Sequence, residues 1–274
     1  MPLMMVLVAS LFASLFVGVS SHETILVSGA TGRTGVLVYK QLKAAGYNVR
    51  GLVRNDTKAK QLLDCGNCTE AEGIFVGDVT KEDSMIAAFT DVDRVVIATG
   101  AVYDPATKSY FGGKTAPRDI DWKGTRSQAT LLARLNPTRP RHVLQISAAM
   151  TTTPDNFLDK LGGGWDVFYK LVAEADVMSL NVPFTIVKPT GLTDTPGGKH
   201  KLVTGHDGEG FSLITDHSIS RADVAAVLVA AITSPALSAN LRFDLSSSPL
   251  RVPTAPKQVL IDAAFPWQNR SGTP

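Results

Sequence analysis

A glycine-rich turn near the start of the chain carries the clearest chemical signal. Residues 29–35 read Gly-Ala-Thr-Gly-Arg-Thr-Gly, between the β-branched run 24–28 and a stretch with helical spacing. Gly29 permits a sharp turn, Gly32 lets a phosphate approach the backbone, and Gly35 lets the helix pack closely on the strand. Free N–H groups at the start of a helix carry partial positive charge and suit a phosphate. The turn therefore predicts a dinucleotide site formed by Gly29, Ala30, Thr31, Gly32, Arg33, Thr34 and Gly35; a turn kept for packing alone is the alternative.

The end of the next predicted strand indicates which dinucleotide binds. Proteins that bind NAD usually place Asp or Glu there, for the ribose 2′-hydroxyl. Residues 51–55 read Gly-Leu-Val-Arg-Asn, so Arg54 stands where the acid is expected, and Lys58 lies one helical turn further on. A guanidinium matches a 2′-phosphate through two parallel hydrogen bonds. We therefore expect NADP rather than NAD, the simpler alternative being that Arg54 faces solvent.

Strands and helices alternate six times along the chain, which predicts an α/β fold with a doubly wound parallel sheet. The expected arrangement is a Rossmann fold, a single extended domain over residues 22–274 with a small substrate-side region near the C-terminus. Residues 100–118 are predicted to form a polar loop, and the tail from Ser246, rich in Pro and Ser, a loose segment. Predicted strands are 24–28, 47–53, 73–77, 94–98, 142–146, 184–187 and 241–245; predicted helices are 35–45, 58–63, 84–89, 120–135, 165–180 and one capped by Ser220 that runs through Asp223 to Ile232.

Residues that follow the strands are expected to face the same ligand, because ligands bind at the carboxyl edge of such a sheet. A substrate pocket is expected there under residues 100–118, 148–164 and 190–219, with Met150, Trp165 and Phe211 as candidate lining residues. The cofactor contacts predicted at this edge are Asp78 and Val79 near the adenine, Thr99, Gly100 and Ala101 near the pyrophosphate and ribose, and Pro189 near the nicotinamide.

Composition excludes several classes of protein. The chain has 274 residues, of which 44% are hydrophobic, so a mostly disordered chain is excluded. The net charge is +2 and no block of like charges occurs, so no nucleic-acid partner is expected. Cys65 and Cys68 are expected to be ordinary loop cysteines, closing into a disulfide only in an oxidising compartment. His200, His206 and His217 lack the spacing of metal ligands, so no metal is predicted.

The N-terminus is set apart from the fold. Residues 1–19 carry no charged side chain, and small residues precede position 21. Residues 1–21 are therefore a hydrophobic leader, either a signal or targeting segment or a retained membrane anchor, with a buried element as the third possibility. A functional leader favours a secretory or organellar location, and otherwise the protein is cytoplasmic. A contact with a membrane is expected only through this segment, if it is retained.

The chain resembles the atypical short-chain dehydrogenase/reductases, and among them the plant NADP-binding group related to the chloroplast translocon protein Tic62 and to NmrA-like proteins. The resemblance covers about residues 24–246 and implies one extended Rossmann domain that binds NADP; plant relatives are often plastid proteins. It is carried by Gly-Ala-Thr-Gly-x-x-Gly at 29–35, Gly-Leu-Val-Arg at 51–54, Gly-Asp-Val-Thr at 77–80, Asp-Trp-Lys-Gly at 121–124, Tyr-Lys-x-x-Ala-Glu at 169–174, Phe-Thr-Ile-Val-Lys-Pro at 184–189 and Ser-Arg-Ala-Asp-Val-Ala at 220–225.

The resemblance also implies a Ser, Tyr and Lys site, which this chain matches only in part. Ser147 fits the Ser position and Lys170 the Lys position, but Asp166 stands four residues before Lys170, where the Tyr acid is expected. Tyr169 points about 100° away around the helix, and Tyr110, four residues before Lys114, lies in the predicted loop. Asp166 and Lys170 are expected to form a helical ion pair.

Three functions remain open. The first is an NADPH-dependent oxidoreductase acting on a small-molecule acceptor that needs no Tyr acid, such as a quinone, flavin or tetrapyrrole, with the proton coming from Ser147 or water. The second is a non-catalytic NADP-binding module that senses redox state or joins an assembly, as a homodimer or with a partner. The third is an epimerase-like isomerase. We prefer the first, by analogy with the commonest use of the fold.

Overall fold

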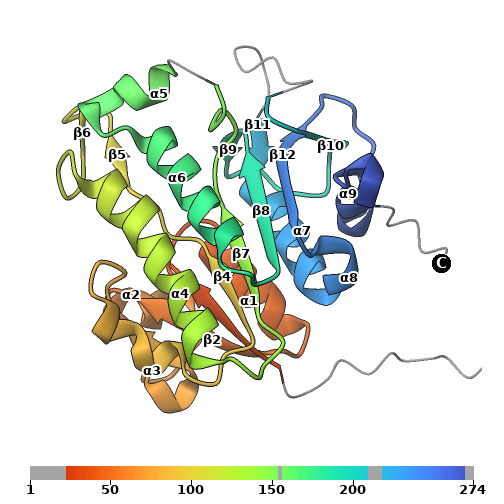
Figure 1. Cartoon of the computed structure of the whole chain (residues 1–274). Coiled ribbons are helices and arrows are strands. Elements are labelled where there is room, and N and C mark those ends of the chain that lie inside the picture. Colours follow the sequence, from red (N-terminus) through yellow and green to blue (C-terminus); the bar gives the residue numbers. More distant parts are fainter. Residues whose placement is uncertain (1–22, 154–155, 209–217, 269–274) are drawn as a thin grey trace, which may run out of the picture.

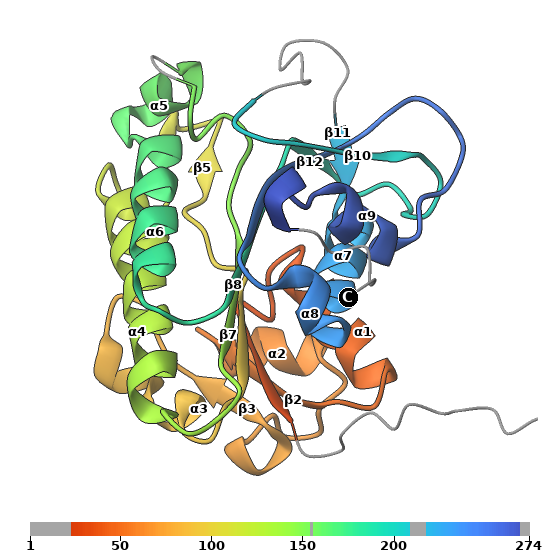
Figure 2. The same ribbon diagram turned by 45° about the vertical axis from the view of Figure 1, so that its right-hand side comes forward.

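Parallel strands form one twisted sheet with helices on both faces (Figures 1 and 2). The computed structural model describes residues 23–153, 156–208 and 218–268. In these residues the strand order is β10-β12-β8-β7-β4-β1-β2-β3, and every neighbouring pair is parallel except β10 and β12. The predicted doubly wound sheet is confirmed. Its strands are β1 (Thr24–Ser28), β2 (Asn48–Val53), β3 (Ile74–Val76), β4 (Arg94–Ile97), β7 (His142–Ile146), β8 (Phe184–Pro189), β10 (Leu202–Gly205) and β12 (Leu241–Ser247).

Central strands bury both faces, because side chains alternate across a strand and helices cover each side. In β1, Leu26 belongs to one hydrophobic cluster and Val27 to the other; in β8, Ile186 and Val187 divide in the same way. One face is covered by α1 (Gly35–Ala44), α7 (Arg221–Thr233) and α9 (Pro256–Asp262), and the other by α3 (Ile86–Phe89), α4 (Thr125–Leu135) and α6 (Asp166–Ser179). The other helices are α2 (Asp56–Leu62), α5 (Phe157–Lys160), α8 (Pro235–Ser238), and 3₁₀ segments at Glu70–Glu72, Glu82–Met85, Leu161–Gly163 and Pro266–Gln268.

Side-chain caps explain where two of the helices begin. The Asn55 side chain accepts a hydrogen bond from the Lys58 N–H and starts α2, two residues before the predicted position. Ser220 Oγ accepts from the Ala222 N–H and starts α7, as predicted. Asp223 does not complete a capping box, because its carboxylate accepts the Gly198 N–H at 2.6 Å. Asp223 therefore fixes a neighbouring turn.

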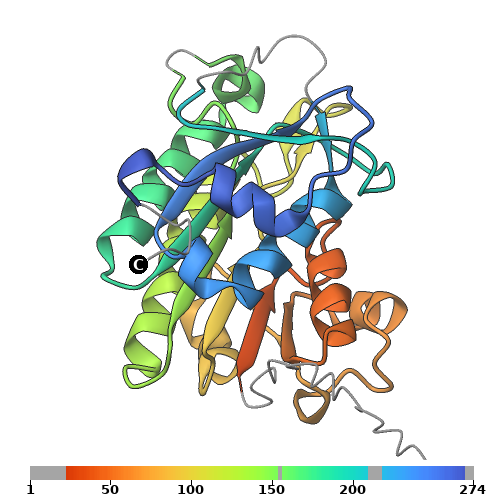
Figure 3. The same cartoon turned by 90° about the vertical axis from the view of Figure 1, so that its right-hand side faces the viewer.

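Two segments predicted to lack regular structure form elements. Residues 100–118 contain the hairpin β5 (Tyr103–Asp104) and β6 (Ser109–Tyr110), followed by a π-helical segment, Pro117–Gly124, that continues into α4. In the tail, α9 (Figure 3) buries Val259 and Leu260 in the core beside α7. Burial of its apolar positions, starting from a proline in the first turn, explains why this segment is ordered despite its composition. A further two-stranded ladder pairs β9 (Gly191–Thr193) with β11 (Ser218–Ser220).

The structure pairs the two cysteines, the alternative that the sequence left open. Cys65 and Cys68 form a disulfide with a Cα–Cα distance of 5.0 Å, just after α2. Cys68 is buried in the hydrophobic cluster that also contains residues of α1. The predicted leader, residues 1–21, lies outside the described residues, and no helix among those described is long and apolar enough to cross a membrane.

Candidate cofactor and active site

The three glycines of the turn after β1 lie where side chains would clash. Gly29 has a φ of +73°, and a Cβ there would lie 2.9 Å from the Ala98 carbonyl oxygen. A Cβ at Gly32 would lie 3.0 Å from the Gly29 oxygen, and one at Gly35 would overlap that oxygen. The tight turn and the close packing expected of Gly29 and Gly35 are therefore built into the backbone.

Free backbone donors lie on the same turn. The N–H groups of Gly29 and Ala30 donate to the Leu52 carbonyl, and that of Gly32 donates to the Gly29 oxygen. The N–H groups of Thr31, Arg33 and Thr34 have no acceptor among the described residues. Because they stand at the N-terminus of α1, they are suited to an anion, and the turn fits the pyrophosphate of a dinucleotide.

An acidic residue links the turn to the opposite wall. The Arg33 guanidinium forms an ion pair with Asp194, just after β9, and Asp194 also contacts Arg221 at 2.8 Å. The Arg33 hydrogen bond is the main reason why the pKa of Asp194 is lowered. The side chain of Arg33, predicted to contact the cofactor, is therefore turned across the groove towards β9.

At the end of β2 the Arg54 side chain is exposed and available to a ligand. Its guanidinium carbon lies 6.0 Å from the ring centroid of Phe111, which follows the β5–β6 hairpin and is 71% exposed. Asp78 accepts hydrogen bonds from Thr80 N–H and Oγ at 2.9 and 2.8 Å. Burial alone would raise the pKa of Asp78, but these hydrogen bonds lower it overall. Asp78 thus braces the loop after β3, and the charges of Lys81 and then Arg54 also lower its pKa.

A cavity of about 510 Å³ opens at the carboxyl edge of the sheet. It brings together predicted residues from five segments of the chain, whereas Val79 is 8% exposed in the core and Trp165 points to solvent. Phe211 lies outside the described residues. The individually predicted residues that line the cavity are Thr34, Thr99, Gly100, Ser147, Met150, Lys170 and Pro189. Phe157, Leu158 and Leu192 also line it and fall within the predicted segments 148–164 and 190–219, whereas Arg221 lies outside every predicted segment of the pocket.

The Lys170 ammonium is held by two carboxylates. It forms an ion pair with Asp121, and lies 3.6 Å from Asp166 one helical turn away, so the predicted helical pair is present. Asp121 also accepts the Ala101 N–H at 2.9 Å, which ties the loop after β4 to α6. Burial raises the pKa of Asp121 to about 6, although Lys170 offsets part of the effect. Burial opposes the charge of Lys170, but the two carboxylates outweigh it and raise its pKa.

The Ser147 hydroxyl is engaged by a buried glutamate. Ser147 Oγ donates a hydrogen bond to Glu174 Oε1, and Arg242 Nε donates to Glu174 Oε2 at 2.7 Å. Glu174 is fully buried on α6, four residues after Lys170 and on the same helix face. Arg242 continues to Asp207, which is exposed. Hydrogen bonds and ion pairs therefore connect Ser147, which lines the cavity, to the exposed Asp207 through Glu174 and Arg242.

Neither tyrosine near Lys170 replaces the missing acid. Tyr169 stacks on Trp122 with ring centroids 5.8 Å apart and does not line the cavity. Tyr110, on β6, is buried, and burial together with the carboxylates of Asp166 and Asp121 raises its pKa. A phenol whose pKa is raised is a poor proton donor at neutral pH.

Among the described residues no group of three or more His, Cys, Asp or Glu side chains is placed to hold a metal. His206 stacks on Phe265 with ring centroids 3.8 Å apart, and its Nδ1 lies 3.1 Å from the Arg242 carbonyl oxygen. His200 lines a different cavity, and His217 lies outside the described residues.

Two known proteins are similar to this chain in sequence. Sanguinarine reductase of Eschscholzia californica is 29% identical over 268 residues, which cover 87% of this chain and 94% of that protein. The Tic62 protein of Pisum sativum, a chloroplastic protein, is 28% identical over 183 residues, covering 61% of this chain and 32% of that protein.

A solved structure has a similar fold, and one family model matches most of the sequence. A short-chain dehydrogenase/reductase of Veillonella parvula, solved in complex with NADP, superposes with a TM-score of 0.60 at 16% identity, over 84% of this chain and 97% of that one. The model of a family described as NAD(P)H-binding matches residues 29–235. The chain therefore belongs to the NAD(P)H-binding family, which is consistent with the resemblance to the atypical short-chain dehydrogenase/reductases inferred from the sequence, and its cofactor is a nicotinamide dinucleotide.

Proposed function

We propose that this protein is an NADPH-dependent reductase of a small-molecule acceptor. The observation that carries the proposal is that Ser147, just after β7, and Lys170 of α6 line one cavity with Thr34 of the glycine turn and Gly100. A nucleotide seated on the turn would extend towards Ser147 and Lys170, as ligands do at the carboxyl edge of doubly wound sheets. The similarity to a reductase over most of both chains supports the same reaction class.

Each part of the groove suits one part of NADPH. The free N–H groups of Thr31, Arg33 and Thr34 would hold the pyrophosphate. The exposed guanidinium of Arg54 would bind the 2′-phosphate through paired hydrogen bonds. Lys170, kept charged by its carboxylates, would hold the ribose next to the nicotinamide, and Pro189 would line the nicotinamide pocket.

Glu174 holds the Ser147 hydroxyl, which would deliver the proton that a Tyr acid would otherwise provide. Bound NADPH supplies the hydride. The hydroxyl of Ser147 would turn from Glu174, give its proton to the acceptor oxygen and take another from water in the cavity. The Glu174 carboxylate positions this hydroxyl as its hydrogen-bond acceptor, and Arg242 holds the carboxylate in place.

A Glu174→Gln variant tests this positioning role. Gln fills nearly the same space but carries no charge, so it would hold the Ser147 hydroxyl less firmly. We therefore expect kcat for NADPH-dependent reduction of menadione to fall about 100-fold, while KM for NADPH stays unchanged. A variant that loses only thermal stability and keeps the wild-type kcat would show that Glu174 is a structural ion-pair partner of Arg242.

An Arg54→Asp variant tests the choice of nucleotide. Removing the guanidinium and adding a charge that repels phosphate should weaken NADPH binding by about tenfold or more, since charge-assisted bonds to phosphate are strong. Binding of NADH, which lacks the 2′-phosphate, should change little. Calorimetric titration of both nucleotides measures the difference, with Lys43→Asp, the same charge change at the end of α1, as the control. Equal losses for NADPH and NADH would contradict the assignment.

A second function, an NADP-binding module without catalysis, is favoured by one observation. The polar groups of Ser147 and Lys170 are both already bound within the protein, by Glu174 and by Asp121. A screen of quinone and flavin acceptors separates the two functions: NADPH consumption supports the reductase, whereas tight binding of both NADP⁺ and NADPH without turnover supports the module. The chloroplastic name of the Tic62 relative supports a plastid location and an assembly partner, which N-terminal sequencing of the mature protein and its co-purification would test.

A further inference from the structure

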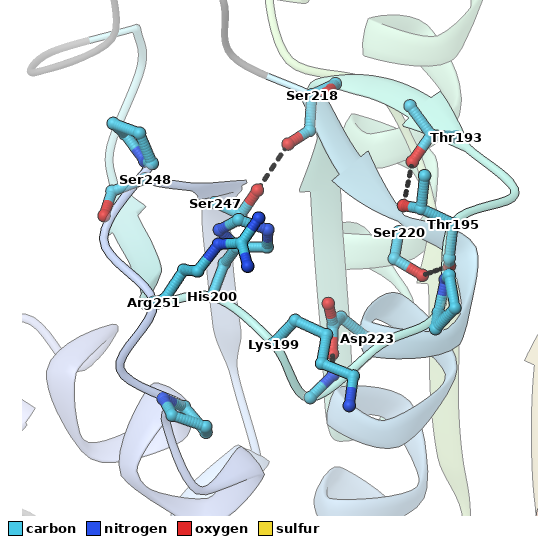
Figure 4. Close-up of a pocket in the computed structure, with 14 residues that line it drawn as sticks. Thr193, Thr195, Lys199, His200, Ser218, Ser220, Asp223, Ser247, Ser248 and Arg251 are labelled. Atoms are coloured by element: carbon cyan, nitrogen blue, oxygen red, sulfur yellow. Dashed lines mark hydrogen bonds between the residues drawn. The ribbon is translucent and has the colours of Figure 1, made fainter.

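A second, larger cavity lies beside the β9–β11 ladder (Figure 4). Its volume is about 730 Å³. Thr193 and Ser220 of the ladder line this cavity, whereas Leu192 of β9 and Arg221, the first residue of α7, line the candidate active site. The two cavities share no lining residue.

Hydroxyl groups are frequent in the walls of this cavity. Its described lining contains no Leu, Ile, Val, Met, Phe, Tyr or Trp, and its apolar surface includes Pro196, Pro249 and Pro253. Several hydroxyls are fixed by hydrogen bonds to one another or to backbone: the Oγ1 atoms of Thr193 and Thr195 lie 2.8 Å apart, and Ser247 Oγ donates to the Ser218 carbonyl oxygen at 2.5 Å (Figure 4). The lining therefore offers a ligand several polar groups in fixed positions beside some apolar surface.

The charge of the lining side chains is positive. Lys199 and Arg251 both line the cavity, and neither has an ion-pair partner among the described residues. Asp223 is the acid of the described lining, and its carboxylate is already engaged by the Gly198 N–H at 2.6 Å. Asp223 also lies in the first turn of α7, where the helix dipole offsets a negative charge. The described lining therefore carries two cations without ion-pair partners and one carboxylate, so positive charge is in excess.

One nitrogen of the His200 imidazole is left for a ligand. Nδ1 is inaccessible to solvent and makes no hydrogen bond with the described residues, so a ligand in the cavity cannot reach it. Nε2 also makes no hydrogen bond with the described residues. His200 lines the cavity, so a ligand would contact the imidazole through Nε2.

We propose that this cavity binds a small phosphate-bearing molecule. Arg251 offers the planar guanidinium that matches phosphate oxygens, and Lys199 adds a second positive charge. His200 supplies a further donor, and the fixed hydroxyls suit the polar remainder of a phosphorylated metabolite. The site is separate from the glycine turn, so the inference does not depend on the proposed reductase activity.

The test follows the His200 side chain directly. The full chain is labelled with ¹⁵N-histidine, the His200 signals are identified from a His200→Gln variant, and inorganic phosphate and then glycerol phosphate are titrated at constant pH and ionic strength. We expect a saturable shift of the His200 signals for both probes. In a Lys199→Ala/Arg251→Ala double variant the affinity should fall about tenfold or more, since two charge-assisted contacts are removed. A Lys257→Ala control, on α9 away from the cavity, should bind like wild type.

Two results would overturn the proposal. One is a His200 shift that grows linearly with phosphate and does not saturate; the other is unchanged binding in the double variant. The titration is repeated with NADP⁺ present, so that phosphate at the glycine turn is displaced. Saturable phosphate binding in a protein that binds no NADP⁺ would keep this site and refute the proposed function. NADP⁺ binding without a His200 response would do the reverse.

Discussion

A Gly35→Ala variant is expected to lose measurable affinity for NADPH. The added Cβ would overlap the Gly29 carbonyl oxygen, which is backbone and cannot move aside as a side chain would. The turn must therefore open, and the N–H groups of Thr31, Arg33 and Thr34 lose their common direction. We expect NADPH to bind at least about 100-fold more weakly, which corresponds to ~3 kcal/mol, and the free energy of unfolding to fall by about 1–3 kcal/mol.

The matched control for this prediction is Gly46→Ala at the other end of α1. Gly46 has a φ of +85°, but a Cβ there would meet no atom within 4 Å. Its substitution adds backbone strain of about 1–2 kcal/mol without changing the turn. Tm from thermal unfolding and Kd from calorimetry are measured for both variants. If Gly35→Ala bound NADPH as tightly as Gly46→Ala does, the glycine turn would not be the nucleotide site.

A Lys170→Met variant is expected to have the second large effect. Its ammonium would contact the ribose, and its removal should lower kcat/KM for NADPH by about 10²–10⁴-fold. The same change leaves Asp121, which is 2% exposed, without its cation. Breaking a buried pair by removing one partner typically costs about 3–5 kcal/mol, so Tm should fall as well.

The pH dependence separates the two effects of the Lys170 substitution. In the wild type, burial raises the pKa of Asp121 to about 6, so stability from this group is present at low pH and is lost as pH rises through that value. Without Lys170 the pKa rises further, and the stability deficit of Lys170→Met should be small near pH 5 and large near pH 8. Adding Asp121→Asn should restore stability but not kcat/KM. Recovery of activity in the double variant would show that Lys170 acts only through Asp121.

The sheet could be predicted because its central strands are short, apolar and separated by helical spacing. The sequence predicts β1, β2, β3, β4, β7 and β8 in this way, since burial on both faces leaves a continuous hydrophobic signal. The β5–β6 and β9–β11 ladders were missed because each has only two or three residues per strand and no apolar run. Helix α9 was not predicted because the tail is rich in Pro and Ser. Pro256 at its start and the apolar pair Val259 and Leu260 are nevertheless typical of a helix.

In the candidate site, contacts between residues close together in the sequence could be predicted, and contacts between residues far apart could not. The glycine turn and the Asp166–Lys170 pair depend on residues near one another in sequence, and spacing alone indicates both. Asp121 lies 49 residues before Lys170, and Glu174 lies 27 residues after Ser147, so no spacing rule connects them. Both acids fall within motifs quoted for the family resemblance, but only the fold assigns their partners.

The double ion pair of Asp194 has a consequence for how a nucleotide leaves the groove. Asp194 joins Arg33 on one rim to Arg221 on the other, and the side chains of Arg33 and Asp194 are 66% and 60% exposed. Exposed pairs of this kind are worth about 0–1 kcal/mol, so they open readily at ambient temperature. These ion pairs across the rim can therefore break without a hinge motion of the sheet or of the helix layers. Dissolved salt weakens them further, because it screens their charges.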